Sequence, residues 1–545
     1  MVFLKYAVIW CVPFALFSQN TAPKIPQWNT VELNLKAENN YNNPYTDVDV
    51  WAQFYNAKGD TLVRPAFWDG DNSWKLRFSP PDSTGRWQWR SSCSNDQDKG
   101  LHGVSGAFFA TTYLGENKLL REGPLQISPG KRNLIHESGK SFLMTADTPW
   151  ALPFRATKEQ ARIYAKNRRE KGFNMVLLMT LQPDTQAKGP NKRNTDQGFK
   201  RAFKDISLGH LNQINVSYFQ YFDGLVDILI ANELVPVFQP VFQGFGWKGL
   251  AVLGTSVQPE EYVRYVKYLL ARYGSNPALW LISADHDGND PGVELSGEML
   301  QQWDCYQQPV GLHYSPCDDF VAEWSKNDPN KRCMHFNKSH QDKEWVDFQW
   351  AQTGHGKTHQ YHKVAAMYDN VPTKAVANGE PTYEGMNGGQ NGCGWWQGQD
   401  AWMQLMYGGT MGIVYGAASL WQWKITGAET GWDPWSDQMV SWEEALHLDG
   451  ATYAGTVGKI LKGVDFTDIQ KRWDMANGKP LLMKEGEVYL SYLENGGKIT
   501  IENVPQKLNY RWIDPRTGIP KKIGKVTSNT FSAPNTDPWV LLITF

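Results

Sequence analysis

Two stretches that end in carboxylates carry the residue types that could do chemistry. The segment ALWLISADHD, residues 278–287, is typical of a buried strand that stops on Asp285, His286 and Asp287. The segment KAVANGEPTYEG, residues 374–385, is typical of a small-residue strand that stops on Glu380. Two carboxylates on different strand ends are what glycoside hydrolysis requires. Apolar strands that end in carboxylates and alternate with helical segments predict the upper rim of a (β/α)8 barrel.

The two carboxylates are expected to take different roles. Glu380 lies beside Pro381, which should hold it rigidly, so we predict that it is the nucleophile. Asp285 is the predicted acid/base, with a pKa raised by burial and by the nearby Glu charge. A retaining reaction needs the two groups ~5–5.5 Å apart. Asp287 and Glu384 are neighbours that could exchange roles with the pair, although Glu384 is better placed to orient Glu380 or to bind a hydroxyl.

The rest of the pocket should come from the ends of the other predicted strands. Trp421 and Trp423 alternate along one predicted strand, so both can point inward, and Trp395 and Trp396 form a stacking platform in a Gly-rich loop. The complete set of predicted substrate-binding residues is Asp147, Trp150, Gln182, His286, Asp287, His313, Tyr314, Glu384, Trp395, Trp396, Trp421 and Trp423. Gln239, Gln243, Gln352 and His355 also follow or end predicted strands.

No metal or cofactor is expected. The run from Asp285 to Asn289 resembles part of a calcium loop, but an EF-hand needs Gly at the sixth place and Glu at the twelfth, where this chain has Asp290 and Ser296. Of the six cysteines, Cys11 lies in the leader, and the other five lack the spacing of a zinc site. Scattered core thiols are favoured, with one bridge among Cys305, Cys317 and Cys333 as the alternative.

Eight predicted strands alternate with helices in the middle of the chain, as a (β/α)8 barrel requires. Thr157 is expected to cap the first helix and Gly172 to end it, and further helices are predicted at 218–232, 259–273 and 399–406, with Ser441 capping the closing helix. The predicted strands are 141–147, 173–181, 234–243, 278–283, 309–316, 346–355, 374–380 and 412–423.

The chain is expected to be multidomain. Residues 1–19 have the basic start and apolar run of a signal peptide, which predicts export to the periplasm or the medium. Alternating apolar and polar residues between Gly-containing turns predict an antiparallel β-sandwich over residues 25–115, ahead of a barrel at 130–465. Residues 475–545 return to a strand pattern and predict a small antiparallel C-terminal domain. Trp74, Trp87 and Trp89 of the sandwich are interpreted mainly as core.

Composition narrows the partners. The 545 residues include 54 basic and 56 acidic side chains, so there is no overall basic surplus for nucleic acid. No stretch after the leader is apolar enough to span a bilayer, and the oligomeric state is left open. The long connection after the second predicted strand has a local surplus of basic residues. This surplus indicates either a solvated loop or a site that recognises an anionic glycan. It consists of Lys188, Lys192, Arg193, Lys200, Arg201 and Lys204.

Three segments carry a resemblance. ADTPWALPFRATKEQARIYAKNRREKGFN, ALWLISADHDG and ANGEPTYEG, in that order, are similar to the apiosidase-like barrels of secreted bacteria, as in glycoside hydrolase family 140. In that family the fourth-strand carboxylate is the Asp of a Gly-Gly-Asp element, which corresponds to Asp285. The seventh-strand carboxylate is the first Glu of an Asn-Gly-Glu-Pro-x-Tyr-Glu element, which corresponds to Glu380. The segments before residue 112 resemble the sandwich that precedes many bacterial carbohydrate-active barrels.

The chain departs from that family at one place. Ser283 and Ala284 stand where the family has two glycines, and a bulkier pair should shift the Asp or narrow the sugar pocket. The resemblance implies an exported glycoside hydrolase of plant or algal polysaccharide, without implying that an apioside is the substrate. Two alternatives stay open: a polysaccharide lyase with Tyr314 or His313 as base, and a non-catalytic carbohydrate-binding protein. The sugar, the linkage and exo or endo action are not determined by the sequence.

Overall fold

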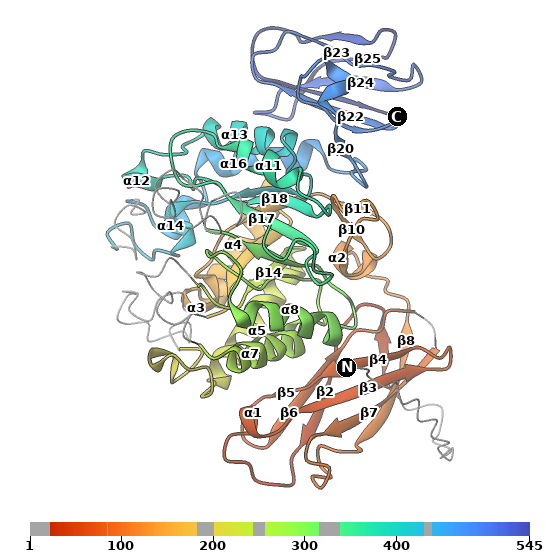
Figure 1. The fold of residues 1–545 in the computed structure, drawn as a ribbon, viewed down its shortest axis with the longest axis vertical. Coiled ribbons are helices and arrows are strands. Elements are labelled where there is room, and N and C mark those ends of the chain that lie inside the picture. Colours follow the sequence, from red (N-terminus) through yellow and green to blue (C-terminus); the bar gives the residue numbers. More distant parts are fainter. Residues whose placement is uncertain (1–21, 84, 182–200, 244–256, 316–337, 430–438) are drawn as a thin grey trace.

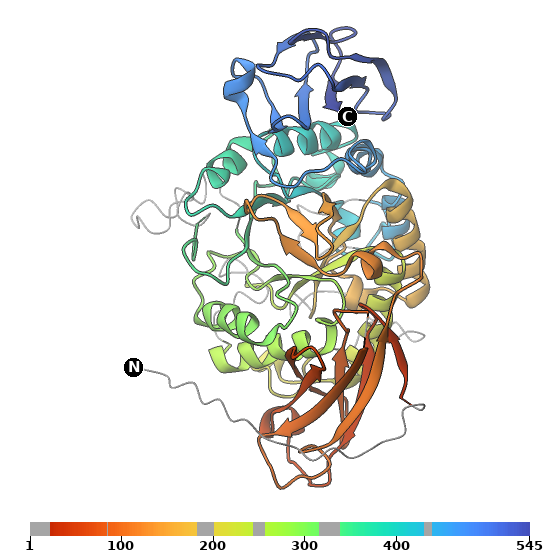
Figure 2. The same cartoon turned by 90° about the vertical axis from the view of Figure 1, so that its right-hand side faces the viewer.

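The computed structural model describes residues 22–83, 85–181, 201–243, 257–315, 338–429 and 439–545. Figure 1 shows three parts along the long axis of the molecule: a β-sandwich, a barrel and a small β domain. Figure 2 shows the same order after a quarter turn, with the barrel between the other two parts. The predicted multidomain fold is therefore confirmed.

The N-terminal sandwich consists of two sheets packed around aromatic side chains. Trp74, Trp87 and Trp89 are at most 7% exposed, which confirms that they belong to the core. The first sheet has the order β1 (Lys24–Pro26), β8 (Ser105–Thr111), β7 (Gly85–Cys93), β3 (Val50–Asn56), β4 (Thr61–Pro65), with only β1 pairing in parallel. The second has the order β2 (Val31–Lys36), β6 (Ser73–Phe78), β5 (Phe67–Trp68).

The barrel is a sheet of eight parallel strands. The seventh and eighth strands form the two edges of this sheet, and the gap between them is bridged where the Met411 nitrogen donates to the Val376 oxygen at 3.1 Å, so the barrel is nearly closed. In chain order the strands are β12 (Met144–Asp147), β13 (Met175–Met179), β14 (Val235–Gln239), β15 (Leu279–Leu281), β16 (Val310–His313), β17 (Phe348–Gln352), β18 (Ala375–Glu380) and β19 (Gly412–Tyr415).

Helices surround this sheet (Figure 1). Thr157 accepts from the Gln160 nitrogen and Gln160 reciprocates, so a capping box starts the first long helix, and Gly172 ends it at φ 106°. Both predicted ends of that helix are confirmed, as is the helix predicted at 259–273. The barrel helices are α4 (Lys158–Lys171), α5 (Val216–Ala231), α7 (Pro259–Tyr273), α8 (Pro291–Trp303), α11 (Tyr361–Tyr368), α13 (Trp395–Met406) and α16 (Asp449–Ile460).

Three sequence predictions in this region are wrong. The eighth strand ends at Tyr415 rather than 423, and α14 (Ala418–Trp421) follows it. Trp395 and Trp396 open α13 instead of lying in a loop. Ser441 caps the four-residue α15 (Trp442–Ala445), whereas the closing helix α16 begins later. In the first and third cases a four-residue helix was not predicted, and in the second the helix predicted from residue 399 begins one turn earlier.

The C-terminal domain is antiparallel, as predicted. Tyr492 of this domain stacks on Trp402 of α13, with ring centroids 6.0 Å apart, so one face of the sheet packs on the barrel. The main sheet has the order β20 (Gln470–Lys471), β21 (Leu482–Lys484), β22 (Val488–Leu493), β27 (Trp539–Thr544), β24 (Asn509–Ile513), β25 (Pro520–Lys525). A second sheet pairs β23 (Lys498–Thr500) with β26 (Thr530–Ser532).

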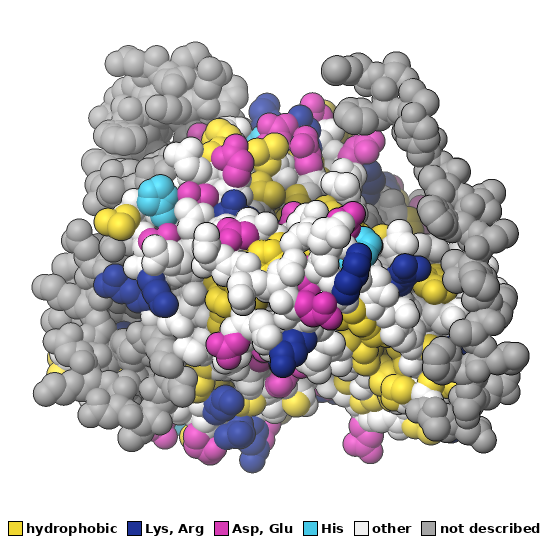
Figure 3. Space-filling view, turned by 90° about the horizontal axis from the view of Figure 1, so that it is seen from below, with side chains coloured by type: hydrophobic (Ala, Val, Ile, Leu, Met, Phe, Trp, Pro, Cys, Tyr) yellow, Lys and Arg dark blue, Asp and Glu magenta, His cyan; other side chains and the backbone are white. Residues whose placement is uncertain are grey.

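Surface and thiol chemistry follow the composition. Seen from the sandwich end, basic and acidic side chains are interspersed, in keeping with the near-zero net charge (Figure 3). Within the described residues no helix is both long and apolar enough to cross a membrane.

Cys93, Cys305 and Cys393 are free thiols, so the predicted alternative of a disulfide that includes Cys305 is wrong. Cys317 and Cys333 lie outside the described residues.

Candidate active site

Two carboxylates and one imidazole converge at the carboxyl ends of the barrel strands. Glu380 is the last residue of β18, His313 is the last of β16, and Asp285 follows β15. One oxygen or nitrogen from each of these side chains lies within 4.8 Å of the other two, and all three residues are buried. The sequence therefore identified a pair that the fold does bring together, together with a predicted pocket residue.

Glu380 is held between two histidines. Its Oε1 lies 3.0 Å from Nε2 of His355, in the loop after β17, and its Oε2 lies 3.2 Å from Nε2 of His313. Burial by itself raises the pKa of the Glu380 carboxyl, but the two imidazoles outweigh burial and hold the pKa below its usual value. Glu380 is therefore an ionised carboxylate, fixed at both oxygens.

Gln239 favours one tautomer of His313 in the resting site. Its amide nitrogen, at the end of β14, lies 2.8 Å from Nδ1 of His313. An amide nitrogen only donates, so Nδ1 accepts and the ring proton sits on Nε2, which faces Glu380. Gln239 thus orients His313, whose Nε2 lies in contact with the Glu380 carboxylate at 3.2 Å.

Asp285 sits on a sharply turned backbone. Its φ is 55°, in the left-handed region that non-glycine residues rarely occupy. The turn is clipped to the loop after β14: Oε1 of Gln243 accepts from the Ala284 nitrogen at 2.8 Å, and the Gln243 nitrogen donates to the Ala284 oxygen at 3.1 Å. These contacts use the backbone of Ala284, so the larger residues at 283 and 284 are accommodated while Asp285 still reaches the site.

The residues after Asp285 form an ionic cluster of their own. Nδ1 of His286 lies 2.9 Å from Asp290 and 3.1 Å from Asp287. Burial lowers the pKa of His286, but the two carboxylates raise it overall to about 10, and the pKa of Asp287 falls to about 2. Asp287 is thus a paired anion rather than a proton donor, which weighs against its exchanging roles with Asp285.

Aromatic rings form one wall beside this carboxylate pair. Trp150 meets His313 edge-on at 6.2 Å and Trp421 at 5.8 Å, so both predicted tryptophans lie near the site. Tyr383 packs on His355, with ring centroids 5.0 Å apart. Burial is the main cause that raises the pKa of the Tyr383 hydroxyl, and the negative charges of Glu380 and Asp285 raise it further. Tyr383 was missed as a site residue, although it is the Tyr of the seventh-strand element.

Asp147 and Tyr314 face the layer between strands and helices. Asp147 accepts from Arg168 and Tyr164 of α4, and this ion pair is fully buried. The Tyr314 hydroxyl donates to Gln349 at 2.7 Å, and burial raises its pKa further above its usual value. Both side chains are occupied by structural partners instead of facing Glu380.

Glu384 is a clamp. Its Oε1 accepts from the nitrogens of Gly394 and Gly450, and its Oε2 accepts from the Tyr415 hydroxyl at 2.6 Å. Burial raises its pKa above the ordinary value. These contacts tie the loop after β18 to α13, α16 and β19, so Glu384 holds the strand end that carries Glu380.

The remaining tryptophans lie elsewhere. Trp423 is stacked on Trp442 at 4.9 Å and donates to Gln160, so it belongs to the helix layer. Trp395 contacts Tyr453, and Trp396 stacks on His359 at 4.3 Å and donates to the Lys357 oxygen. Gln182 lies outside the described residues, as do all of the predicted basic cluster except Arg201 and Lys204, which are exposed.

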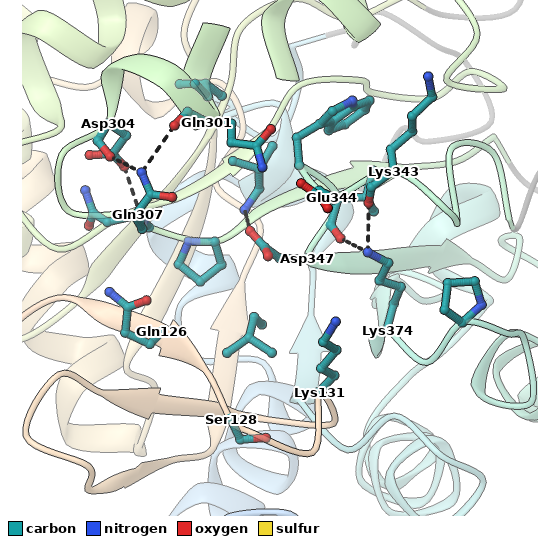
Figure 4. Close-up of a pocket in the computed structure, with 18 of the residues that line it drawn as sticks. Gln126, Ser128, Lys131, Gln301, Asp304, Gln307, Lys343, Glu344, Asp347 and Lys374 are labelled. Carbon is teal, nitrogen blue, oxygen red and sulfur yellow. Dashed lines mark hydrogen bonds between the residues drawn. The ribbon is translucent and has the colours of Figure 1, made fainter. Parts of the chain in front are cut away.

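A cavity of about 710 Å³ lies at the opposite end of the barrel, beside the starts of β16, β17 and β18 (Figure 4). Asp347 projects towards it, accepts from the Val310 nitrogen at 3.0 Å, and has a pKa raised to about 6 by burial. Lys374 donates to the backbone oxygens of Lys343 and Val346. These polar groups hold strand starts, far from the carboxylate pair, so this cavity takes no part in the candidate site.

A sequence profile of the apiosidase-like catalytic domain matches residues 128–468, more than half of the chain. The chain belongs to the apiosidase-like family. A second profile, a domain of unknown function called DUF5060, matches residues 24–94, within the sandwich. Comparison with curated proteins gives no match.

Solved structures similar to this apiosidase-like chain show the same fold. A protein of Bacteroides vulgatus, described provisionally as a glycoside hydrolase, has a TM-score of 0.67 at 16% identity, covering 96% of this chain and 99% of its own. A glycoside hydrolase family 5 protein of the same organism has a TM-score of 0.61 at 19% identity, covering 78% and 94%. By its match to the apiosidase-like catalytic domain, the chain is a glycoside hydrolase, with a carbohydrate as its substrate.

Proposed function

We propose that this glycoside hydrolase works with retention of configuration, with Glu380 as nucleophile and Asp285 as acid/base. The observation that carries the proposal is the close approach of the two carboxylates, whose nearest oxygens are within 4.8 Å. Retaining enzymes hold the pair ~5–5.5 Å apart, whereas inverting enzymes leave roughly 6.5–9.5 Å to admit a water. An approach within 4.8 Å supports the shorter, retaining arrangement.

The proposed reaction has two steps. In the first, a Glu380 oxygen bonds to the anomeric carbon while the glycosidic bond breaks, and Asp285 gives its proton to the leaving oxygen. In the second, Asp285 takes a proton from water, whose oxygen displaces Glu380. His313 and His355 keep Glu380 ionised before attack and receive it as the leaving group afterwards, since both lie in contact with its oxygens.

Azide rescue tests the assignment. Azide in place of water should restore Asp285→Ala with a glycosyl azide of retained configuration, and should restore Glu380→Ala with an azide of inverted configuration. Product configuration read by NMR distinguishes the two residues. An inverted azide from the Asp285 variant would contradict the assigned roles.

We further propose export by residues 1–19 and action on plant or algal polysaccharide, including pectic, uronic-acid or sulfated glycans. The signal-like leader and the exposed Arg201 and Lys204 in the connection after β13 support this. Replacing Lys200 and Arg201 by Ala should raise KM on an acidic oligosaccharide, and the effect should shrink as salt screens the attraction. An equal KM at low salt on every acidic substrate would leave only a solvated loop.

The lyase alternative loses its support. A lyase base would have to be Tyr314 or His313, and Tyr314 is buried against Gln349 while the Nε2 proton of His313 faces Glu380. A product that gains the mass of water marks hydrolysis, and an unsaturated product marks elimination. The carboxylate pair likewise weighs against a purely carbohydrate-binding protein.

A further inference from the structure

Asp285, His313 and Glu380 have the donor set of a divalent metal site. One carboxylate oxygen from each acid and one imidazole nitrogen all lie within 4.8 Å of one another. Within the described residues, neither Nε2 of His313 nor Oε2 of Glu380 has a well-aligned hydrogen-bond partner, although they are 3.2 Å apart and fully buried. Two buried polar atoms thus point into the same small volume.

The spacing suits zinc. Zn²⁺ binds His nitrogen and carboxylate oxygen at about 2.0–2.2 Å in a tetrahedron, which places neighbouring ligand atoms roughly 3.3 Å apart. The 3.2 Å between Nε2 and Oε2 already matches this. An Asp285 oxygen lies within 4.8 Å of both atoms and would have to close to roughly 3.3 Å, and a water can take the fourth position.

Gln239 can support His313 in either tautomer. In the resting site its amide nitrogen donates to Nδ1. Its Oε1 is buried without a partner among the described residues, so rotating the amide would let that oxygen accept from an Nδ1 proton. Nε2 would then present a lone pair towards the two carboxylates. An oxygen acceptor behind a ligating histidine is the usual second partner of a zinc ligand.

We propose that this trio binds Zn²⁺ and that the metal blocks the active site. On binding, the His313 proton moves from Nε2 to Nδ1, Asp285 releases its proton to the buffer, and Glu380 binds as the anion it already is. Both carboxylates are then unavailable for glycoside cleavage. The inhibition, though not the binding, rests on the proposed roles of Asp285 and Glu380.

The chain offers a matched control. The cluster of His286, Asp287 and Asp290 has the same residue types, but Nδ1 of His286 already contacts both carboxylates, at 3.1 Å and 2.9 Å. A metal there would have to break both of these contacts. We therefore expect zinc at the buried trio and not at this cluster.

Calorimetric titration of ZnCl₂ into the full, EDTA-treated enzyme tests the site. Wild type should bind one equivalent, Asp285→Asn should bind at least about tenfold more weakly, and Asp290→Asn should bind as wild type does. Zinc should also abolish hydrolysis reversibly, with EDTA restoring it. Absence of one-to-one binding, or binding that Asp290→Asn weakens and Asp285→Asn leaves unchanged, would overturn the proposal. Binding is measured without substrate, so a failure of the proposed reaction would show separately, as missing hydrolysis in metal-free enzyme.

Discussion

At the scale of single residues, the main feature of the site is that Glu380 is deeply buried and yet ionised. Glu380→Gln should lower kcat at least about 10³-fold because the amide cannot form the glycosyl ester, while the melting temperature stays near that of wild type.

Asp285→Asn should lose much less activity on substrates with an activated leaving group than on natural substrates, because an activated leaving group needs little protonation. Steady-state kinetics on activated and natural substrates measure both effects, and equal losses of the Asp285 variant on the two would move the acid role elsewhere.

Gln239 should act on the same carboxylate through His313. Gln239→Leu removes the donor to Nδ1, so the Nε2 proton no longer faces Glu380 reliably and the Glu380 pKa should rise towards its ordinary value. The proposed reaction needs Glu380 ionised, so the acidic limb of kcat/KM should move to higher pH. The profile of kcat/KM against pH checks this, and a uniform loss at all pH values would indicate only damaged packing.

Neighbouring strand-end residues show what the sequence can and cannot predict. Strand ends, their order and the carboxylate pair follow from apolar runs and polar stops. The sequence does not predict which side chains of each strand point into the barrel. His313 faces Glu380, while the adjacent Tyr314 contacts Gln349 and Asp147 contacts Arg168. Side chains alternate faces along a strand, and a run buried on both sides gives no signal of which is inward.

The loop after β15 is the element that presents Asp285, and its ionic cluster should make its stability pH-dependent. The raised pKa of His286 contributes stability that is complete below about 6.5 and is lost as pH rises through about 10. The lowered pKa of Asp287 contributes stability that is lost as pH falls towards about 2. Asp290→Asn should therefore lower Tm at pH 6, and the difference from wild type should shrink by pH 10. Thermal melts across this range measure it, and a constant difference would contradict the ionic origin.

At the scale of the whole molecule, the sandwich and the barrel share a core. Tyr306, in the loop between α8 and β16, packs among the buried residues of the sandwich. Its hydroxyl accepts from the Ser79 nitrogen at 2.7 Å and donates to the Ser79 oxygen at 3.0 Å. Arg77 of the sandwich and Arg272 of α7 both bind Asp223 of α5, so buried ion pairs reinforce the junction.

This junction predicts joint unfolding. The same short connection that carries Tyr306 leads directly into β16 and hence to His313, so the sandwich braces a strand of the active site. Tyr306→Phe should leave both backbone groups of Ser79 buried without partners, at a cost of about 1–3 kcal/mol each at most. Calorimetry should show one transition for sandwich and barrel in wild type, and an earlier sandwich transition in Tyr306→Ala, which also loses the ring. Two separate transitions already in wild type would mean that the sandwich is an independent appendage with no bearing on the barrel.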